Sequence, residues 1–402
     1  MSRNDQGGDA VQFYRSFLVV SLWEVAMTGA VSFSGAWLWS IRTHVTGIML
    51  YYLLWFGTMT VIFAWGTHAR KTPNPIRLQT SGIAMAMAYL AAFLMLASWI
   101  RVLIWLIAMM VGLASGLYWL AVYVRAAQAT YNHERYNAWL GMIETGAAVV
   151  IPPVVGAVIV ASPGLRGYRL TFLGAFILLA VALSLTLSQA SSARDGDAKA
   201  ERRAGTTWLL SRPQLPFVGL GLLGFRDGML FFMPGLWLFM LTQNAAVLGW
   251  YLTCQAIVQT VMFAASASRW RLPLWAALSA GIIAGGILLR WHTTSGIFVY
   301  GILNAFGYPA YKVPLEGRAL SVIQEWSTDA QERIRWTSLK EFWLNGGRLA
   351  AFVLLFLILA FGASPLPTIR WLLIGWGGVS FALYYSIRRI GESQSVLGGV
   401  NT

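Results

Sequence analysis

The segment SGAWLW at residues 34–39 has a counterpart, PGLWLF, at residues 234–239. A further match keeps the same offset of 200 residues without a gap, since TVIFA at 60–64 corresponds to TVMFA at 260–264. Matches that include Gly and Trp are rarer by chance than aliphatic matches in an apolar chain. Weak internal symmetry of this kind predicts that one helical unit occurs twice in the same orientation.

The composition predicts a membrane protein. Of the 402 residues, 57% are hydrophobic and only 11% are charged, and the mean hydropathy is +0.62. A soluble domain carries about 25% charged residues, so this chain lacks the polar surface that water requires. Within a bilayer only helices and closed barrels satisfy the backbone, and the alternating segments of about ten residues that are typical of barrel strands do not occur. We therefore expect an all-α membrane protein.

Twelve apolar stretches are long enough to cross the hydrocarbon core, which takes about 20 helical residues. They lie at residues 14–39, 46–66, 78–99, 102–124, 138–160, 169–189, 214–241, 246–267, 272–290, 294–312, 340–362 and 368–387. Together with the repeat, they predict two six-helix bundles, residues 1–190 and 213–402, joined by a cytoplasmic linker at residues 191–212. The polar segment 313–335 is expected as a second long break, between the tenth and eleventh spans.

The basic residues orient the chain. With a cytoplasmic N-terminus, twenty-one of the 29 Lys and Arg residues fall in inside segments and six in outside segments. Because cytoplasmic loops collect Lys and Arg, both termini are expected in the cytoplasm, and the chain in a bacterial-type inner membrane. The net charge of +14 has the same origin, so no nucleic-acid partner is expected. The first apolar stretch is too long for a signal peptide and is expected to be the first span.

Two parallel six-helix halves, a long middle loop and cytoplasmic termini resemble the major facilitator superfamily over nearly the whole chain. The superfamily's signature between spans 2 and 3 is similar to GTHARK at residues 66–71, although its Asp is absent here. The resemblance implies alternating access between the two bundles, and it gives a gating role to basic residues of the loops. These residues are Arg70, Lys71 and Arg77 in the first half and Arg269 and Arg271 in the second.

The fifth span contains a segment rich in Gly and Pro. Its residues Gly146, Pro152, Pro153 and Gly156 resemble a motif of proton-coupled exporters in that superfamily. The alternative is a kink that only lets helices pack.

Five charged residues lie well inside spans, away from the span ends, where an ionisable side chain is costly and usually faces a partner or a water-filled path. By the resemblance, spans 1 and 7 line the central cavity, so Glu24 and Asp227, together with Glu144, are candidates for proton coupling. Burial favours the protonated form of a carboxyl group. Arg226 and Arg348 are candidates for binding an anionic group, because a guanidinium binds one bidentately. Alternatively, the five charges neutralise one another between helices. Arg226 and Asp227 are consecutive, so they are expected to point about 100° apart and not to share a partner.

Polar and aromatic residues of the same spans are further candidates for binding substrate. They are Tyr51, Tyr118, Trp119, Tyr123, Gln255, Gln259, Asn304, Tyr308, Tyr311 and Asn345. A spacing of four places Trp119 on the helix face of Tyr123, and Gln255 on that of Gln259. The alternatives are an interfacial belt for the aromatic residues and contacts between helices for the glutamines.

Motifs for metal or nucleotide chemistry do not occur. All four histidines lie at or near span ends, so neither a metal site nor a histidine relay is expected within the membrane. The sequence contains no P-loop and no His-Glu-x-x-His, so no nucleotide or other cofactor is expected.

These observations predict a monomeric secondary transporter rather than an enzyme, with the lipid bilayer, a small molecule and protons as partners. Proton-coupled export of a small amphipathic molecule by an antiporter is the first expectation, and uptake or exchange of an organic anion is the second. A membrane-embedded lipid-modifying enzyme is the alternative from another class, because residues 325–341 are rich in charge. That stretch is also typical of a solvated cytoplasmic helix. A scaffold that has lost transport is a third possibility, suggested by the altered signature.

Overall fold

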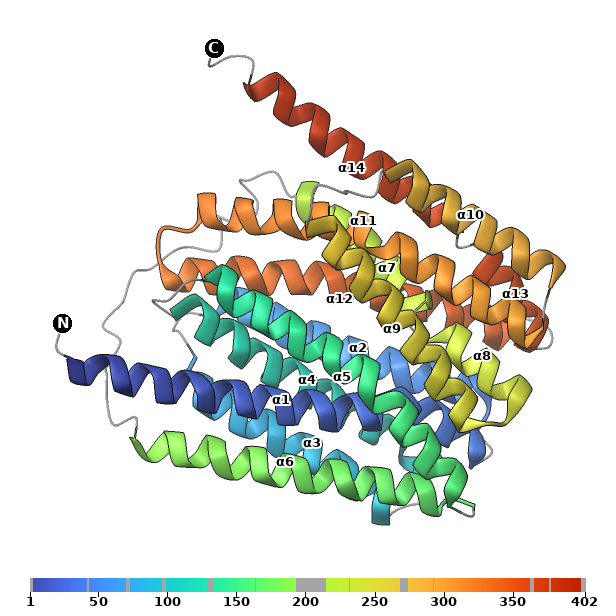
Figure 1. The fold of residues 1–402 in the computed structure, drawn as a ribbon, viewed down its shortest axis with the longest axis horizontal. Helices are drawn as coiled ribbons and strands as arrows, with labels where there is room; N and C mark the ends of the chain where they lie inside the picture. The colour runs from blue at the N-terminus through green and yellow to red at the C-terminus, as the bar shows by residue number, and fades with distance from the viewer. Residues whose placement is uncertain are drawn as a thin grey trace.

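The computed structural model shows a bundle of long helices (Figure 1). It describes residues 3–41, 43–69, 73–95, 99–128, 133–162, 164–192, 215–230, 232–267, 274–291, 293–361, 365–375 and 377–398. These residues contain helices, turns and short connections, and no strand. The all-α prediction is thereby confirmed.

The helices follow the predicted spans in order. The first half contains α1 (Arg3–Ser40), α2 (Val45–His68), α3 (Pro75–Met95), α4 (Ile100–Gln128), α5 (His133–Ala161) and α6 (Arg166–Ser192). The second half contains α7 (Leu215–Leu230), α8 (Met233–Thr242), α9 (Ala245–Ala267), α10 (Leu274–Arg290), α11 (Thr294–Trp326), α12 (Ala330–Phe361), α13 (Pro365–Gly375) and α14 (Gly377–Gly398). The pair α7 and α8 occupies the seventh predicted span, and the pair α13 and α14 covers the twelfth. Within the described residues, nine helical stretches are long and apolar enough to cross a membrane, and the chain is a multi-pass membrane protein.

Side-chain caps explain several helix ends. Asn74 accepts hydrogen bonds from the backbone N–H groups of Ile76 and Arg77 at the start of α3. Asn244 does the same for the first turn of α9, and Thr293 accepts from Gly296 in the first turn of α11. These caps satisfy backbone donors that a helix leaves free at its N-terminus.

The polar segment 313–335, predicted as a break between spans, is not a break in helical structure. The helix α11 continues to Trp326 and α12 begins at Ala330, so only residues 327–329 separate them. Asp329 accepts a hydrogen bond from the Glu332 N–H at 2.8 Å and caps α12. Hydropathy marks where a helix leaves the apolar layer, but the backbone bonds of a helix do not end there.

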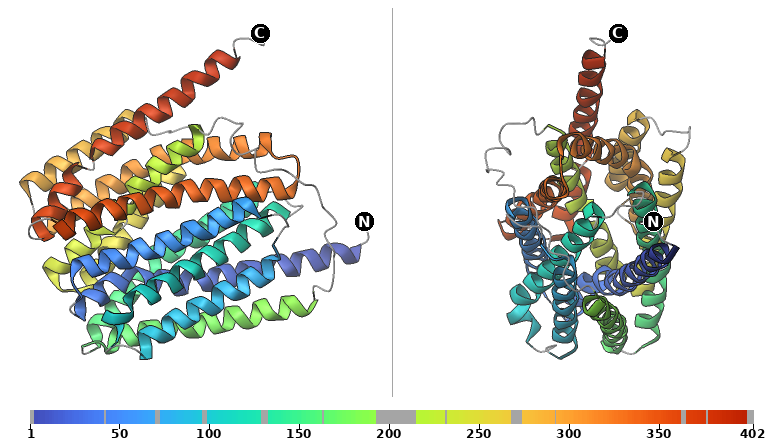
Figure 2. Two further views of the ribbon diagram at one scale, coloured as in Figure 1. Left: turned by 180° about the vertical axis from the view of Figure 1, so that it is seen from behind. Right: turned by 90° about the vertical axis from the view of Figure 1, so that its left-hand side faces the viewer.

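The two halves form separate bundles that meet along a few helices (Figures 1 and 2). The first half, blue to green in Figure 1, packs α3 on α4 and α6, and α1 on α5 and α6. The second half packs α7 on α12, and α10 on α11 and α14. The halves meet mainly where α2 lies along α12 and where α5 crosses α9. The predicted linker, residues 191–212, lies outside the described residues except for the last two residues of α6, so the domain boundaries stay a prediction.

Aromatic side chains of the two halves pack against one another. The ring of Tyr52 on α2 lies 3.6 Å from that of Phe232, between α7 and α8, and 5.5 Å from that of Phe352 on α12. A β-carbon at Gly35 of α1 would lie 2.6 Å from the Phe232 ring. The repeated segment 34–39 therefore includes a position where only glycine leaves room for the other half.

The helices α5 and α9 cross in backbone contact. A β-carbon at Gly156 would lie 2.6 Å from the Ala245 carbonyl oxygen, and one at Gly249 would lie 2.5 Å from that of Pro152. Small residues on both helices allow this approach. The Gly–Pro segment of α5 thus packs at a helix crossing, and its role in export stays a prediction.

We expect Gly156→Val to destabilise the protein, because the added isopropyl group would push α9 away from α5. Overpacking of this kind costs about 1 to 3 kcal/mol and would lower the melting temperature of the detergent-solubilised protein. Gly146→Val is the matched control, since no described atom lies within 4 Å of a β-carbon built there on the same helix. Equal melting temperatures for the two variants would contradict the proposed role of the crossing.

Candidate functional site

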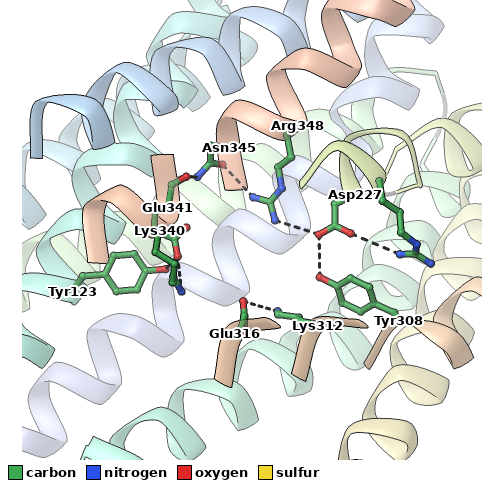
Figure 3. A network of polar contacts seen from close by, with 10 residues as sticks. Tyr123, Asp227, Tyr308, Lys312, Glu316, Lys340, Glu341, Asn345 and Arg348 are labelled. Atoms are coloured by element: carbon green, nitrogen blue, oxygen red, sulfur yellow. Dashed lines mark hydrogen bonds and ion pairs between the residues drawn. The ribbon is translucent and has the colours of Figure 1, made fainter. Parts of the chain in front are cut away.

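Asp227 lies at the centre of a buried polar cluster (Figure 3). Its carboxylate is 3.8 Å from the Arg226 guanidinium and 3.7 Å from that of Arg348. The Tyr308 hydroxyl donates a hydrogen bond to Asp227 Oδ2 at 3.0 Å. We call Arg226, Asp227, Tyr308 and Arg348 the Asp227 cluster. It brings together α7, α11 and α12.

Arg226 is held from several sides and is only 3% exposed. Its Nη2 donates to the backbone and side-chain oxygens of Asn304, at 3.4 and 3.3 Å. Its guanidinium also lies 5.6 and 5.5 Å from the ring centres of Tyr308 and Tyr311, within the range of cation–π attraction. Its Nε is buried without a hydrogen-bond partner.

The expectation that Arg226 and Asp227 do not share a partner is wrong. Arg226 lies over the ring of Tyr308 while Asp227 accepts from the hydroxyl of the same residue. The angle of about 100° describes the directions in which the β-carbons of consecutive residues point. The arginine side chain is long and the phenol ring is large, so both residues can still contact Tyr308.

Arg348 connects the Asp227 cluster with the first half of the chain. Its Nη1 donates to Asn345 Oδ1 at 3.1 Å, and its guanidinium lies 5.7 Å from the ring centre of Phe56 on α2. Its side chain is 25% exposed, so it is the most accessible charge of the cluster. The Asp227 cluster therefore lies where the two halves meet.

A second buried ion pair lies on α12, near the N-terminal end of its apolar part (Figure 3). Lys340 Nζ is 2.9 Å from Glu341 Oε1, and the side chains are 10% and 7% exposed. Tyr123 of α4 donates a hydrogen bond to Glu341 Oε1 at 3.1 Å. The Lys340–Glu341 pair thereby links the two halves through α4.

Helix α12 carries parts of both groups on one face. Glu341, Asn345 and Arg348 are spaced by four and three residues, which places them on the same side of a helix. Asn345 also donates to the Glu341 backbone oxygen at 2.9 Å. One rigid helix therefore connects the Lys340–Glu341 pair with the Asp227 cluster.

The sequence led us to expect a solvated helix at residues 325–341. In the structure, part of this stretch is buried. Arg335, Lys340 and Glu341 are buried. Arg335 donates to the Ala69 carbonyl oxygen, at the C-terminal end of α2, through Nε at 3.2 Å and Nη2 at 3.0 Å. Contacts with α2 and α4, which hydropathy does not reveal, remove these side chains from solvent.

Four charged residues near the site were not among the candidates. They are Lys312, Glu316, Lys340 and Glu341. Lys312 and Glu316 form an i,i+4 pair at 3.9 Å that is about 30% exposed. That spacing is visible in the sequence, but the predicted span ended at residue 312 and hid the pair.

Glu24 and Glu144 belong to the first half. Both are half-buried, on α1 and α5, and they interact electrostatically with each other. Glu144 also interacts electrostatically with Lys312 of α11. An acid of the first half therefore feels the charge of a base in the second half.

The remaining candidates are distributed more widely. Tyr51 and Tyr118 are fully buried in the first half, where Tyr51 bonds to the Tyr89 hydroxyl and Tyr118 stacks on Trp23. Trp119 lies against Tyr118 and Tyr123, with ring centres 5.9 and 6.0 Å away. Tyr51, Tyr118 and Trp119 are therefore not part of the Asp227 cluster.

In the part of the chain that the structure describes, no polar contact joins the predicted glutamines or gating residues to the Asp227 cluster. Gln255 donates to the Tyr251 hydroxyl at 3.0 Å, while Gln259 makes no polar contact with a described residue. Arg77 is exposed at the start of α3. The other predicted gating residues, Arg70, Lys71, Arg269 and Arg271, lie outside the described residues.

Metal-ligating side chains do not gather in the described part of the chain. No group of three or more His, Cys, Asp or Glu residues there could hold a metal ion. The Asp227 cluster instead offers an acid that can exchange a proton and two guanidinium groups that can bind an anion.

Comparisons with known proteins agree with this architecture. No family model matches the sequence. The uncharacterized protein YqgE of Bacillus subtilis (strain 168) is 24% identical over 354 residues, which cover 84% of this chain and 80% of that protein. The crystal structure of a bacterial homologue of the iron transporter ferroportin, in its inward-facing state, has a TM-score of 0.68 at 16% identity and covers 94% of this chain and 97% of its own. The nucleoside transporter NupG has a TM-score of 0.62 at 13% identity, over 94% of this chain and 97% of its own. The chain therefore has the fold of the major facilitator superfamily, an all-α membrane fold of two parallel six-helix bundles.

Proposed function

We propose that this protein is a proton-coupled secondary transporter that works by alternating access. One observation carries the proposal: a buried carboxylate, Asp227, is shared by two arginines where the two halves meet. Ionisable residues inside a membrane protein usually belong to ion or substrate paths. In transporters built from repeats, the site lies between the repeats near the middle of the membrane.

The similar structures support a transport function at the level of their fold. One of the two solved structures is of a bacterial homologue of the iron transporter ferroportin, and the other is of the nucleoside transporter NupG. One fold serves many substrates, so neither solute passes to this chain by similarity. We further propose, on the basis of the distribution of Lys and Arg, that the chain lies in an inner membrane with both termini in the cytoplasm, and that it acts as a monomer.

The alternatives from the sequence have different support. Export of an amphipathic molecule, the first expectation, relied on aromatic ligands and on the Gly–Pro segment of α5, and of the aromatic candidates Tyr51 and Tyr118 are packed inside the first half. The lipid-modifying enzyme relied on residues 325–341, whose Arg335, Lys340 and Glu341 are engaged between helices. The anion alternative relied on Arg226 and Arg348, and these two residues share Asp227.

Reconstitution into liposomes tests the proposal. The pH-sensitive dye pyranine would be trapped inside, and benzoate, uridine or the amphipathic cation tetraphenylphosphonium would be added outside. We expect one of these solutes to drive a protein-dependent change of internal pH, because a coupled carrier moves protons with its solute. Liposomes without protein are the control for passive permeation. Identical pH traces with and without protein for all three solute classes would refute proton coupling.

A further inference from the structure

The Asp227 cluster contains more positive than negative charge. Two guanidinium groups face one carboxylate, and Lys312 of α11 also interacts electrostatically with Asp227. The cluster proper has a formal charge of +1 when Asp227 is ionised and +2 when it is protonated. A buried excess of charge is costly unless another group compensates it.

The arginines have unused hydrogen-bonding capacity. Both ion pairs with Asp227, at 3.7 and 3.8 Å, are longer than a hydrogen bond. Arg226 Nε is buried and has no acceptor. An arginine carries five N–H donors in a planar fork that suits a carboxylate. Donors are therefore available for an acceptor that the protein itself does not provide.

The surroundings of Arg348 suit an anion with an apolar part. The guanidinium lies 5.7 Å from the ring centre of Phe56. That ring stacks on Phe352 at a centroid distance of 5.4 Å and an angle of 9°. A flat apolar group next to the guanidinium would contact the Phe56 ring, while its anionic end would reach the arginines.

We propose that the substrate class is a small organic carboxylate, which binds Arg348 and Arg226 as their counter-ion in place of the negative charge of Asp227. Asp227 is then an internal competitor of the substrate. The inference rests on the proposed transport function and adds its substrate class and the sign of its coupling.

Protonation of Asp227 removes the competitor. The charged or titratable groups that face Asp227 are Arg226 on its own helix, Tyr308 and Lys312 on α11, and Arg348 on α12. When Asp227 takes up a proton, both arginines lose their counter-ion and gain affinity for an external carboxylate. Linkage is reciprocal, so bound carboxylate also favours protonation of Asp227. Proton and substrate therefore bind together and move in the same direction, which makes the carrier a symporter.

Binding in detergent, without any gradient, tests this inference separately from transport. Benzoate would be titrated into the solubilised protein by calorimetry at mildly acidic and mildly alkaline pH. We expect the wild type to bind benzoate at least about tenfold more tightly at acidic pH, a difference of about 1.4 kcal/mol. Benzamide, which has the same ring but no charge, is not expected to bind, and phenylphosphonate tests whether another anion fits as well.

Variants identify the residues responsible. Asp227→Asn is expected to bind benzoate tightly at both pH values, because the competitor is removed permanently. Arg348→Gln is expected to lose binding, and Arg348→Lys, which keeps the charge but not the fork, to weaken it. Arg290→Gln, at the exposed end of α10, is the control for general loss of positive charge and should bind as the wild type does.

Several outcomes would overturn the inference. These are equal binding of benzamide, tighter binding of phenylphosphonate than of benzoate, unchanged or weaker benzoate binding in Asp227→Asn, and no benzoate binding by any variant. Carboxylate binding with the expected pH dependence but no proton flux in liposomes would instead refute the transport function and leave the site intact. Proton flux driven by uridine or tetraphenylphosphonium would support the transport function but refute the proposal that the substrate is a carboxylate.

Discussion

Replacing Asp227 by Asn is expected to make transport independent of pH while the protein stays folded. Asparagine has nearly the same shape, and its carbonyl oxygen can still accept the hydrogen bond that Tyr308 donates to Asp227 at 3.0 Å. The amide cannot take up a proton, however, so a proton gradient no longer drives solute movement. Pyranine in proteoliposomes should report no coupled proton flux with the solute that is active in the wild type, whereas solute exchange without a gradient should persist.

Asp329→Asn is the matched control for this experiment. Asp329 is exposed in the turn between α11 and α12 and caps α12 by accepting from the Glu332 N–H. Asparagine caps a helix about as well as aspartate, so neither stability nor proton flux should change. Wild-type proton flux in Asp227→Asn would contradict its role in coupling, and equal losses in both variants would show that the effect is not specific to the Asp227 cluster.

Replacing Lys340 by Met is expected to cause the largest loss of stability. The side chains of Lys340 and Glu341 are only 10% and 7% exposed, and they lie 2.9 Å apart. Removing the lysine charge leaves a buried carboxylate with a single neutral donor, the Tyr123 hydroxyl. Breaking a buried pair in this way costs about 3 to 5 kcal/mol. The melting temperature of the detergent-solubilised protein measures the effect.

Two further variants test whether the loss comes from the unpaired charge. The double variant Lys340→Met with Glu341→Gln should recover most of the stability, because glutamine is neutral and can still accept from Tyr123. Lys312→Met removes a lysine from a pair that is about 30% exposed and 3.9 Å apart, and a solvated pair is worth about 0 to 1 kcal/mol. A loss in Lys312→Met as large as in Lys340→Met, or no recovery in the double variant, would refute the explanation by burial.

The Asp227 cluster and the Lys340–Glu341 pair both depend on α12. Asn345 lies between them and contacts Arg348 on one side and the Glu341 backbone on the other. A displacement of α12 against α2, α4 and α7 would therefore change both groups at once. In the proposed carrier, a change in the charge of Asp227 would therefore act through α12 on the contact between the two halves.

Most residues of the candidate site could be named from the sequence, but which of them contact one another could not be predicted. Arg226, Asp227 and Arg348 were identified because a charge within a span is rare and costly. The same criterion missed Lys340 and Glu341, because charges at the ends of the spans were left out and these are the first two residues of the span 340–362. Tyr51 and Tyr118 were included because they occur in spans of the right kind, yet they pack into the first half. Residue type and span number do not say which way a side chain points.

The sequence by itself determined the membrane environment, the all-α class, the order of the spans and their duplication into two halves. These follow from composition, apolar length and the matches between 34–39 and 234–239, which are local properties of the chain. Only the tertiary structure decided that Asp227 faces two arginines, that Arg348 reaches Phe56 of the other half, and that Lys340 and Glu341 are buried. The physical reason is that a buried charge depends on partners distant in sequence, and their distances follow from how helices pack rather than from the period of any one helix.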